Sequence, residues 1–230
     1  SEFAISTARN SPAYLNIAGA LNINITGRNN RNNRASGIHQ DLTKNAEYRL
    51  RFADRAHTAL FNNGPLSPTG ATTIWRRRSD QMDDAIVAES ARWGDYRRDV
   101  QSAGGWQNSN YELYTKDDQY LATQKYIIET HLQQRPSILL NQLRARNLYP
   151  AVAAPVYAQK GNSLTIENPN GSGSIFYTTD GSDPRNPSAS TYSNAVTLTA
   201  SATYKSRVLE NGVWSALQSC LLYTSDAADD

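Results

Sequence analysis

The pattern of apolar and polar residues changes near residue 150. Before it, apolar residues recur at spacings of three and four, which is the period of an amphipathic helix. After it, β-branched and aromatic residues alternate with polar ones, which is the period of a half-buried strand. The change predicts an α+β multidomain protein, with a helical region over residues 1–150 and a β-sandwich over residues 151–219.

Four helices are expected in the helical region. An N-cap at Asp41 or Thr43 begins the first helix, and Asn62-Asn63-Gly64-Pro65 ends it, because Gly and Pro leave the helical conformation. A cap at Thr69 begins the second helix, which ends at Gly94-Asp95. The predicted apolar faces are Tyr48, Phe52, Ala56, Ala59 and Leu60 in the first helix, and Trp75, Met82, Ile86 and Trp93 in the second.

The third helix is predicted over residues 116–132. Pro136 is expected in the first turn of a fourth helix, where its missing N–H breaks no hydrogen bond. Two segments lack apolar periodicity. We interpret residues 1–40 as largely loop and residues 101–115 as an exposed loop.

Six short strands are predicted in the β region, near residues 155–159, 163–168, 174–179, 195–199, 202–209 and 213–218. Asn211-Gly212 between the last two is a strong hairpin signal, because both residues tolerate a positive φ. Six short strands separated by such turns favour an immunoglobulin-like sandwich.

Charge and composition limit the partners. Arg76-Arg77-Arg78 is typical of a polyanion site or of a solvated helix face, and Asp80 lies where it can pair with these arginines along the helix. We therefore predict no nucleic-acid partner. No apolar run reaches the ~18 residues that cross a bilayer, so we predict no membrane partner either. Cys220 is the one cysteine, which excludes an internal disulfide and a cysteine-rich zinc site.

No pattern indicates a catalytic site. Carboxylates for acid–base chemistry must face each other, but Asp83 and Asp84 are adjacent on a helix and point about 100° apart. Residues 1–150 contain no glycine-rich phosphate loop and no Asp-rich metal motif. We therefore predict no catalytic residue in this chain.

Three blocks of the helical region resemble the C-terminal half of the CotH kinase-like family of spore coat proteins, in the form found in large secreted bacterial proteins. The blocks are NAEYRLRFADRAHTALFNNGPLSP (45–68), DDAIVAESARWGD (83–95) and RPSILLNQLRARNLYP (135–150). The resemblance implies that the helical region is the remnant of a kinase-like C-lobe.

The same resemblance implies ATP-dependent phosphoryl transfer with a divalent metal in the longer parent protein. The family's nucleotide and metal residues lie mainly upstream of these blocks, so no cofactor is implied for this fragment. Glu2, in Ser1-Glu2-Phe3, matches the last acid of the family's metal motif and is the one metal ligand that the resemblance suggests.

Residues 173–215 resemble the chitobiase/β-hexosaminidase C-terminal type of domain, whose hallmark is the turn YTTDGSDP at residues 177–184, followed here by Tyr192. The resemblance implies an accessory domain of secreted carbohydrate-active or surface proteins.

Two interpretations of this turn stay open. In the first, Tyr177 and Trp214 bind glycan, and the carboxylates of the turn hold glycan or calcium. In the second, Asp180, Gly181 and Asp183 fold the turn through bonds to backbone N–H groups, and the two aromatic residues pack. A calcium loop has more carboxylates at alternating positions, which favours the second interpretation.

Residues 220–230, CLLYTSDAADD, resemble the translation of a transposase-type sequencing adapter, which often ends open reading frames assembled from environmental DNA. We interpret them as an adapter-derived tail, and we expect the natural chain to continue past about Ser219.

These observations predict a non-catalytic fragment of a secreted or surface bacterial CotH-like protein, which acts as a structural or accessory module outside the cell. The expected partners are a cell-surface glycan or another domain of the same protein. Two alternatives stay open: part of an ATP-dependent atypical kinase whose catalytic residues lie upstream, and a carbohydrate-binding module.

Overall fold

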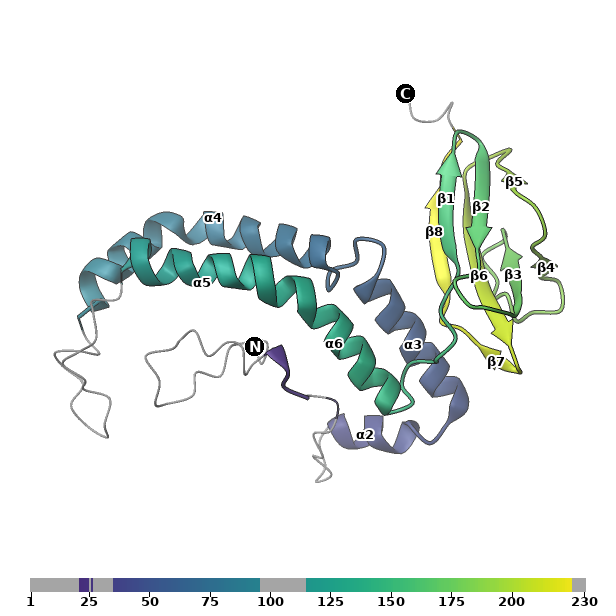
Figure 1. Ribbon diagram of the computed structural model, residues 1–230, viewed down its shortest axis with the longest axis horizontal. Coiled ribbons are helices and arrows are strands. Elements are labelled where there is room, and N and C mark those ends of the chain that lie inside the picture. Colours follow the sequence, from purple (N-terminus) through teal and green to yellow (C-terminus); the bar gives the residue numbers. More distant parts are fainter. Residues whose placement is uncertain (1–20, 25, 27–34, 96–114, 225–230) are drawn as a thin grey trace. The chain divides into compact units, whose positions relative to one another are not determined.

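The computed structural model describes residues 21–24, 26, 35–95 and 115–224 (Figure 1). The chain forms two compact units. The first consists of residues 1–25 and 60–141, and the second of residues 26–59 and 142–230. The helix α3 (Ala46–Leu60) therefore belongs, except for its last residue, to the same unit as the β-strands.

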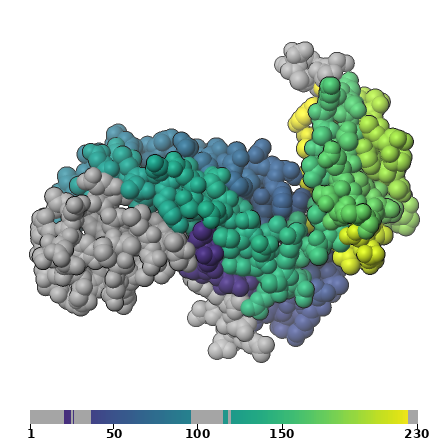
Figure 2. All heavy atoms as spheres, viewed as in Figure 1, coloured from purple at the N-terminus to yellow at the C-terminus, as the bar shows by residue number. Residues whose placement is uncertain are grey.

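The first unit is a pair of long helical segments. One segment is α4 (Pro68–Trp93). The other is a continuous helical run made of the π-helical turn η2 (Lys116–Tyr120), α5 (Leu121–Tyr126), a second π-helical turn η3 (Ile127–His131) and α6 (Leu132–Ala145). The last residues of α6 belong to the second unit. Figures 1 and 2 show α4 and the run that contains α5 side by side. Polar pairs join them: Trp75 Nε1 donates to Gln124 Oε1 (2.5 Å), Ser79 Oγ lies 3.1 Å from Tyr120 Oη, and Lys116 Nζ pairs with Asp83 Oδ2 (2.7 Å).

The start of α4 is set by Ser67 rather than by Thr69, so the predicted cap is wrong by two residues. Ser67 has an extended backbone, its Oγ accepts from Gly70 N at 3.1 Å, and Pro68 occupies the first turn. The predicted apolar stripe of this helix remains largely at the surface, with Trp75, Met82 and Trp93 exposed by 36%, 51% and 48%. Polar contacts with η2 and α5, one of them made by Trp75 itself, join α4 to the second segment.

Pro136 lies inside α6 and does not begin a separate helix, so the prediction of a break before it is wrong. The wide turn η3 carries the helix onward, since Leu132 N–H bonds back to Ile127 O. Proline removes one hydrogen bond and its ring meets the preceding turn, which bends a helix. Figure 1 shows the run changing direction between α5 and α6.

The helices of the second unit also differ in detail from the prediction. Residues 35–40, expected as loop, lie in α2 (Ala35–Leu42). Thr43 Oγ1 bonds to Gln40 O at the end of α2, and Asn45 Oδ1 accepts from Tyr48 N at 3.0 Å at the start of α3. Asn45 is therefore the N-cap of α3, in place of Asp41 or Thr43.

The strands form two antiparallel sheets. A three-stranded sheet has the order β1 (Val156–Lys160), β2 (Ser163–Glu167), β5 (Val196–Thr197). A five-stranded sheet has the order β4 (Ser190–Thr191), β3 (Ser174–Thr178), β6 (Ala202–Glu210), β7 (Val213–Trp214), and β8 (Gln218–Leu222) also pairs with β6. The core between the sheets contains Val152, Leu164, Ile166, Ile175, Leu198, Tyr204, Val208 and Leu222. The structure confirms an α+β chain in which a helical region precedes a β-sandwich.

The turn between β6 and β7 is the predicted hairpin. Asn211 and Gly212 have φ of 49° and 77°, as a two-residue hairpin turn requires. The segment that resembles adapter sequence begins inside β8: Cys220 pairs with Tyr204, and Leu222 is part of the core. Its first three residues therefore pack as an ordinary edge strand, whatever their origin.

Candidate functional site

Three polar residues of α3 face the sandwich. Glu47, Asp54 and His57 are spaced seven and three residues apart, which places them on one face of the helix. The face predicted from the apolar residues is a neighbouring one, where Phe52 and Tyr48 contact His39 of α2. The helix thus has a polar face directed at the strands, which is unusual for a contact inside one compact unit.

Arg207 of β6 lies at the centre of this contact and is fully buried, with 0% exposure. Its Nη1 and Nη2 donate to the two carboxylate oxygens of Asp54 at 2.8 Å each. Its Nε and Nη2 donate to Asp183 at 3.0 Å, and Nη1 also donates to Ser215 O at 2.9 Å. All five N–H donors of the guanidinium therefore have an acceptor, and two carboxylates surround the charge.

Arg185 repeats this arrangement beside it. Its Nη1 and Nη2 donate to Glu47 Oε2 and Oε1 at 2.6 and 3.0 Å, while Nε and Nη2 donate to Asp183. Asp183 thus lies between two arginines of the sandwich, each of which holds one acid of the helix. We call Glu47, Asp54, Asp183, Arg185 and Arg207 the ion-pair network.

The pKa values in the network follow from these contacts. Hydrogen bonds from Arg185 and then from Arg51 lower the pKa of Glu47 to about 2. Burial opposes ionisation of Asp183, but hydrogen bonds from Arg207 and Arg185 outweigh it and hold its pKa well below the usual range. Burial alone would lower the pKa of Arg207, yet its bonds to Asp54 and Asp183 raise it. Glu47, Asp183 and Arg207 are therefore charged at neutral pH.

His57 extends the contact at the end of the network. It is 6% exposed; its Nδ1 lies 2.7 Å from Tyr149 Oη and its Nε2 lies 2.9 Å from Gln218 Oε1. The neutral ring satisfies both contacts, since the amide oxygen can only accept and the tyrosine hydroxyl can donate. Burial lowers the pKa of His57, so the ring is neutral at pH 7.

The network has the residue types of a phosphoryl-transfer site but not its chemistry. Its three carboxylates already accept from two arginines, so their lone pairs are directed at fixed donors rather than at a metal or a proton in transit. Among the described residues, no group of three or more His, Cys, Asp or Glu is placed to hold a metal ion. The arrangement is that of a structural contact between a helix and a sheet.

The predicted turn residues lie beside the network. Asp180 Oδ1 accepts from the backbone N and the Oγ of Ser182, and Gly181 has φ of +81°, so both residues shape the turn. Asp183 Oδ1 also accepts from Arg185 N, at 3.0 Å. Asp183 therefore shapes the turn and pairs with both arginines, and only the first of these roles was expected from the sequence.

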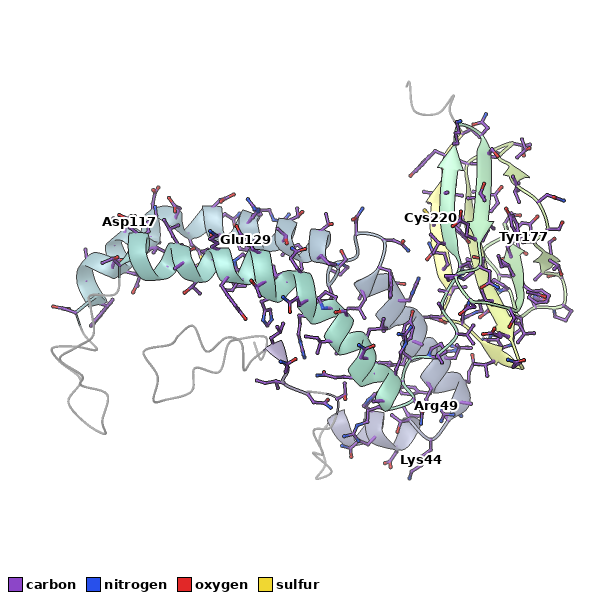
Figure 3. The ribbon with its side chains drawn as sticks, viewed as in Figure 1. Lys44, Arg49, Asp117, Glu129, Tyr177 and Cys220 are labelled. Carbon is purple, nitrogen blue, oxygen red and sulfur yellow. The ribbon has the colours of Figure 1, made fainter. Side chains whose placement is uncertain are left out.

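The two aromatic residues proposed for glycan binding lie on different faces of the sheet. Tyr177, labelled in Figure 3, packs against the core and its ring meets Tyr192 edge-on at 6.3 Å. Trp214 is half-buried on the outer face and meets Phe176 edge-on at 5.4 Å. They do not form one surface. Glu2, the suggested metal ligand, lies outside the described residues.

Sequence reasoning missed the helix side of the network. Glu47 and Asp54 lie seven residues apart within the first CotH-like block, and His57 follows three residues later, which is a periodic polar stripe. Arg207 occurs in a strand of alternating pattern, where an outward charge ordinarily faces water. Asp54 and Arg207 are 153 residues apart in the chain, and no sequence pattern connects the polar stripe of the helix with the strand arginine.

The fold and the contact define a β-sandwich with a helix docked on one sheet. Within it, residues 152–216 match the family model of the Chitobiase/beta-hexosaminidase C-terminal domain. No curated protein matches the chain. The matched residues include Asp183, Arg185 and Arg207, whereas Glu47 and Asp54 lie outside the match, so the helix adds one half of the network to the matched domain. Among the described residues, no helix is both long and apolar enough to span a bilayer.

Proposed function

We propose that this chain is a non-catalytic accessory piece of a secreted or surface bacterial protein, in which the sandwich is fixed to a helix of the preceding region. The observation that carries this proposal is the ion-pair network. Its carboxylates are paired with arginines, and these pairs hold α3 on the sheet. A buried arginine with two carboxylates holds one orientation, since each bidentate pair constrains direction as well as distance. The network therefore suits a rigid joint better than a reaction centre.

The parent protein in this proposal is CotH-like. The supporting observation is the resemblance of three helical blocks, the first of which contains Asp54 and His57. If the parent is an atypical kinase, its nucleotide and metal ligands lie upstream, and this piece packs behind them. ATP with Mg²⁺ or Mn²⁺ should then leave the thermal unfolding of this chain unchanged. A metal-dependent rise in Tm on adding ATP would contradict the proposal, because a ligand that binds the native state raises Tm.

Carbohydrate binding is a second candidate, and Trp214 is the observation that favours it. This tryptophan is half-buried beside Phe176 on the outer face, so part of its ring is open to solvent. Aromatic faces of this kind stack on sugar rings. Tyr177 does not contribute to such a surface, because it packs in the core.

The test is retention of the full chain on insoluble chitin, with Trp214→Ala as the variant. Trp93→Ala is a matched control, because Trp93 is also partly exposed but lies on α4. Glycan binding predicts that Trp214→Ala abolishes retention and that Trp93→Ala does not. Absence of retention by the unmodified chain, or equal loss of retention in both variants, would contradict glycan binding and leave only the structural role.

A further inference from the structure

Three Asn-Gly pairs differ in how firmly the fold holds them: Asn63-Gly64, Asn170-Gly171 and Asn211-Gly212. In such a pair the backbone N of glycine can attack the side-chain carbonyl carbon of asparagine, because glycine has no Cβ to obstruct the approach. Ammonia leaves, a cyclic succinimide forms, and water opens the ring to aspartate or isoaspartate. The reaction requires that the asparagine side chain and the glycine N can turn towards each other.

The side chain of Asn170 is fixed. Its Oδ1 accepts from Ala153 N at 2.9 Å, and its Nδ2 donates to Ala153 O at 3.0 Å and to Asn168 Oδ1 at 2.8 Å. These bonds join the start of the sandwich to the turn between β2 and β3. The ring can close only after they break, because the amide must turn towards Gly171 N and its nitrogen must leave. The fold therefore protects this asparagine.

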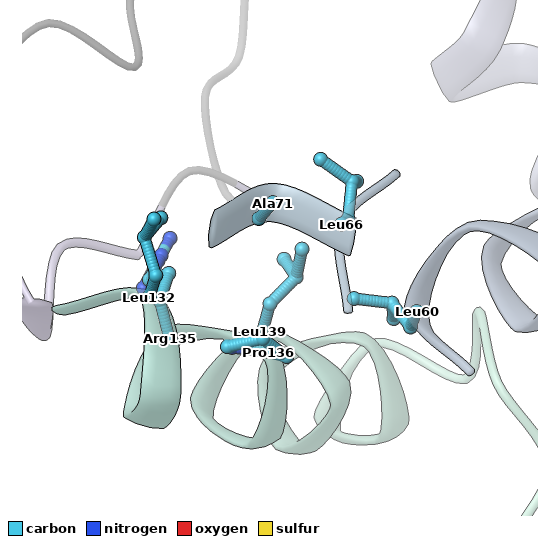
Figure 4. A pocket seen from close by; sticks show the side chains of 7 residues that line it. All are labelled: Leu60, Leu66, Ala71, Leu132, Arg135, Pro136 and Leu139. Carbon is cyan, nitrogen blue, oxygen red and sulfur yellow. The ribbon is translucent and has the colours of Figure 1, made fainter. Parts of the chain in front are cut away.

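The pair that follows α3 is held through its glycine. Gly64 N donates to Phe61 O at 2.8 Å, and Gly64 O accepts from Ser67 N at 2.9 Å and from Ser67 Oγ at 2.8 Å. Leu60 and Leu66, on either side of the pair, line one hollow (Figure 4). The attacking nitrogen is therefore engaged, and the loop that contains it is anchored at both ends.

Asn211-Gly212 has neither restraint. Both residues are exposed and form the two-residue turn between β6 and β7. The ladder bonds lie between the flanking residues Glu210 and Val213, so Gly212 N is outside the ladder. Among the described residues the side chain of Asn211 has no hydrogen-bond partner, and a Cβ placed at Gly212 would meet no atom within 4 Å. Side chain and nitrogen can both move here.

We infer that Asn211 is a site of spontaneous deamidation and that the fold protects Asn63 and Asn170. Gly212 N bonds to Cγ of Asn211, and the Cγ–Nδ2 bond breaks. The proton of Gly212 N passes through solvent to the departing nitrogen, which leaves as ammonia. Water then opens the succinimide at the side-chain carbonyl to give aspartate, or at the backbone carbonyl to give isoaspartate.

The isoaspartate product should loosen β7. It directs the backbone through the side chain of residue 211, which lengthens the turn by one carbon atom. The two-residue turn sets the register in which Leu209 pairs with Trp214. A longer turn disturbs this pairing and the edge-on contact of Trp214 with Phe176. The inference concerns the turn itself and does not depend on glycan binding.

The experiment follows all three pairs in the full chain. The protein is kept in mildly alkaline buffer made with heavy-oxygen water, digested in acid, and its Asn-Gly peptides are measured by mass spectrometry. Asn211 should take up one heavy oxygen atom at least about tenfold faster than Asn170, whose side-chain hydrogen bonds must first break. In urea the three should react at similar rates, because glycine follows each asparagine. Equal rates in the folded chain, or an unreactive Asn211, would overturn the inference.

A variant tests the reason for the selectivity. Asn168→Ala removes the acceptor of Asn170 Nδ2 and of Asn170 N, so deamidation of Asn170 should become about fivefold faster. Asn194→Ala is the control, since Asn194 is exposed and bonds only to the neighbouring Ser193, and it should change none of the rates. An unchanged rate at Asn170 in Asn168→Ala would refute protection by these bonds. If that variant does not fold, the three rates in the unmodified chain decide.

Hydrogen exchange tests the effect on the hairpin. Exchange at Val213 N should rise in the isoaspartate form, because the lengthened turn weakens its pairing with Glu210. Asn211→Asp is the matched control, since it adds the same charge and keeps the path of the backbone. Equal exchange in the isoaspartate form and the unmodified chain would contradict the loosening of β7.

Discussion

Asp54→Asn tests whether the ion-pair network holds the helix on the sandwich. The substitution keeps the shape of the side chain and removes its charge. Asp54 accepts three short hydrogen bonds, two from Arg207 and one from Leu217 N, all at 2.8 Å. An asparagine side chain has one acceptor oxygen, and its NH₂ group takes the place of the second carboxylate oxygen. That NH₂ group then faces an N–H donor to which it cannot bond. At least one N–H of a fully buried guanidinium then loses its acceptor.

The expected cost is about 3 kcal/mol. Breaking a buried ion pair by removing one partner costs about 3–5 kcal/mol. The lower end applies because Asp183 still neutralises Arg207 and because the Asp54 side chain is 18% exposed. For a unit of this size, such a loss lowers the Tm of the transition that contains the sandwich by on the order of 10 °C.

The assay is chemical unfolding combined with amide hydrogen exchange. Exchange should rise throughout residues 46–59 in the variant, because α3 loses its attachment to the sheet. Asp41→Asn is a matched control, since Asp41 pairs with Lys44 at 3.6 Å and both side chains are 83% exposed. It should stay within about 0.5 kcal/mol of the unmodified chain. The reasoning is refuted if Asp54→Asn costs less than about 1 kcal/mol or leaves the exchange of α3 unchanged.

Two further predictions concern acid and the turn glycines. As pH falls, the second unit should lose stability in two stages. The first begins below about 6.5, because the pKa of the buried, neutral His57 is lowered and the unfolded chain therefore binds the proton first. The second lies between about 4.5 and 2, because the pKa of Glu47 is lowered to about 2 in the folded chain. Unfolding followed at a series of pH values should show the first stage vanish in His57→Gln and the second shrink in Glu47→Gln; a flat profile between pH 7 and 3 would contradict both assignments. Gly173→Ala should cost about 3 kcal/mol, since φ is +96° and the added Cβ would lie 2.8 Å from Leu209 O, whereas Gly181→Ala should cost about 1 kcal/mol, since φ is +81° but the space is open. Urea unfolding measures both, and equal costs would show that the close contact is relieved by backbone movement.

Most of the strands could be predicted from the sequence because their evidence is local, but β4 was missed, and the strand predicted at residues 213–218 divides into β7 and the start of β8. Alternation along residues 163–167 and 202–210 places successive side chains on opposite faces of the sheet. The turn Asn211-Gly212 sets the register of its hairpin, in which Glu210 pairs with Val213. The helix boundaries were less well predicted, since several residues compete for each end. Ser67 and Thr69 are both good caps, and the choice between them depends on the position of Pro68.

The ion-pair network could not be predicted, because it depends on contacts that are far apart in the sequence. A strand arginine is expected to face water, and Arg207 is buried because a helix supplied by residues 46–60 covers it. The same limit affected Pro136. A proline at a helix start and a proline inside a bent helix have the same local sequence, and the wide turn at residues 127–131 decides between them.

The position of Asp183 explains how one turn can both fold itself and fix a helix. In the turn itself, this residue needs one carboxylate oxygen, which accepts from Arg185 N. The remaining lone pairs are free to orient Arg185 and Arg207, and each arginine then presents a fixed pair of donors to a helix. A helix can dock there only if it carries acids about seven residues apart, as Glu47 and Asp54 are. A module that keeps the turn but lacks these arginines should therefore fold its turn equally well and have no affinity for an acidic helix.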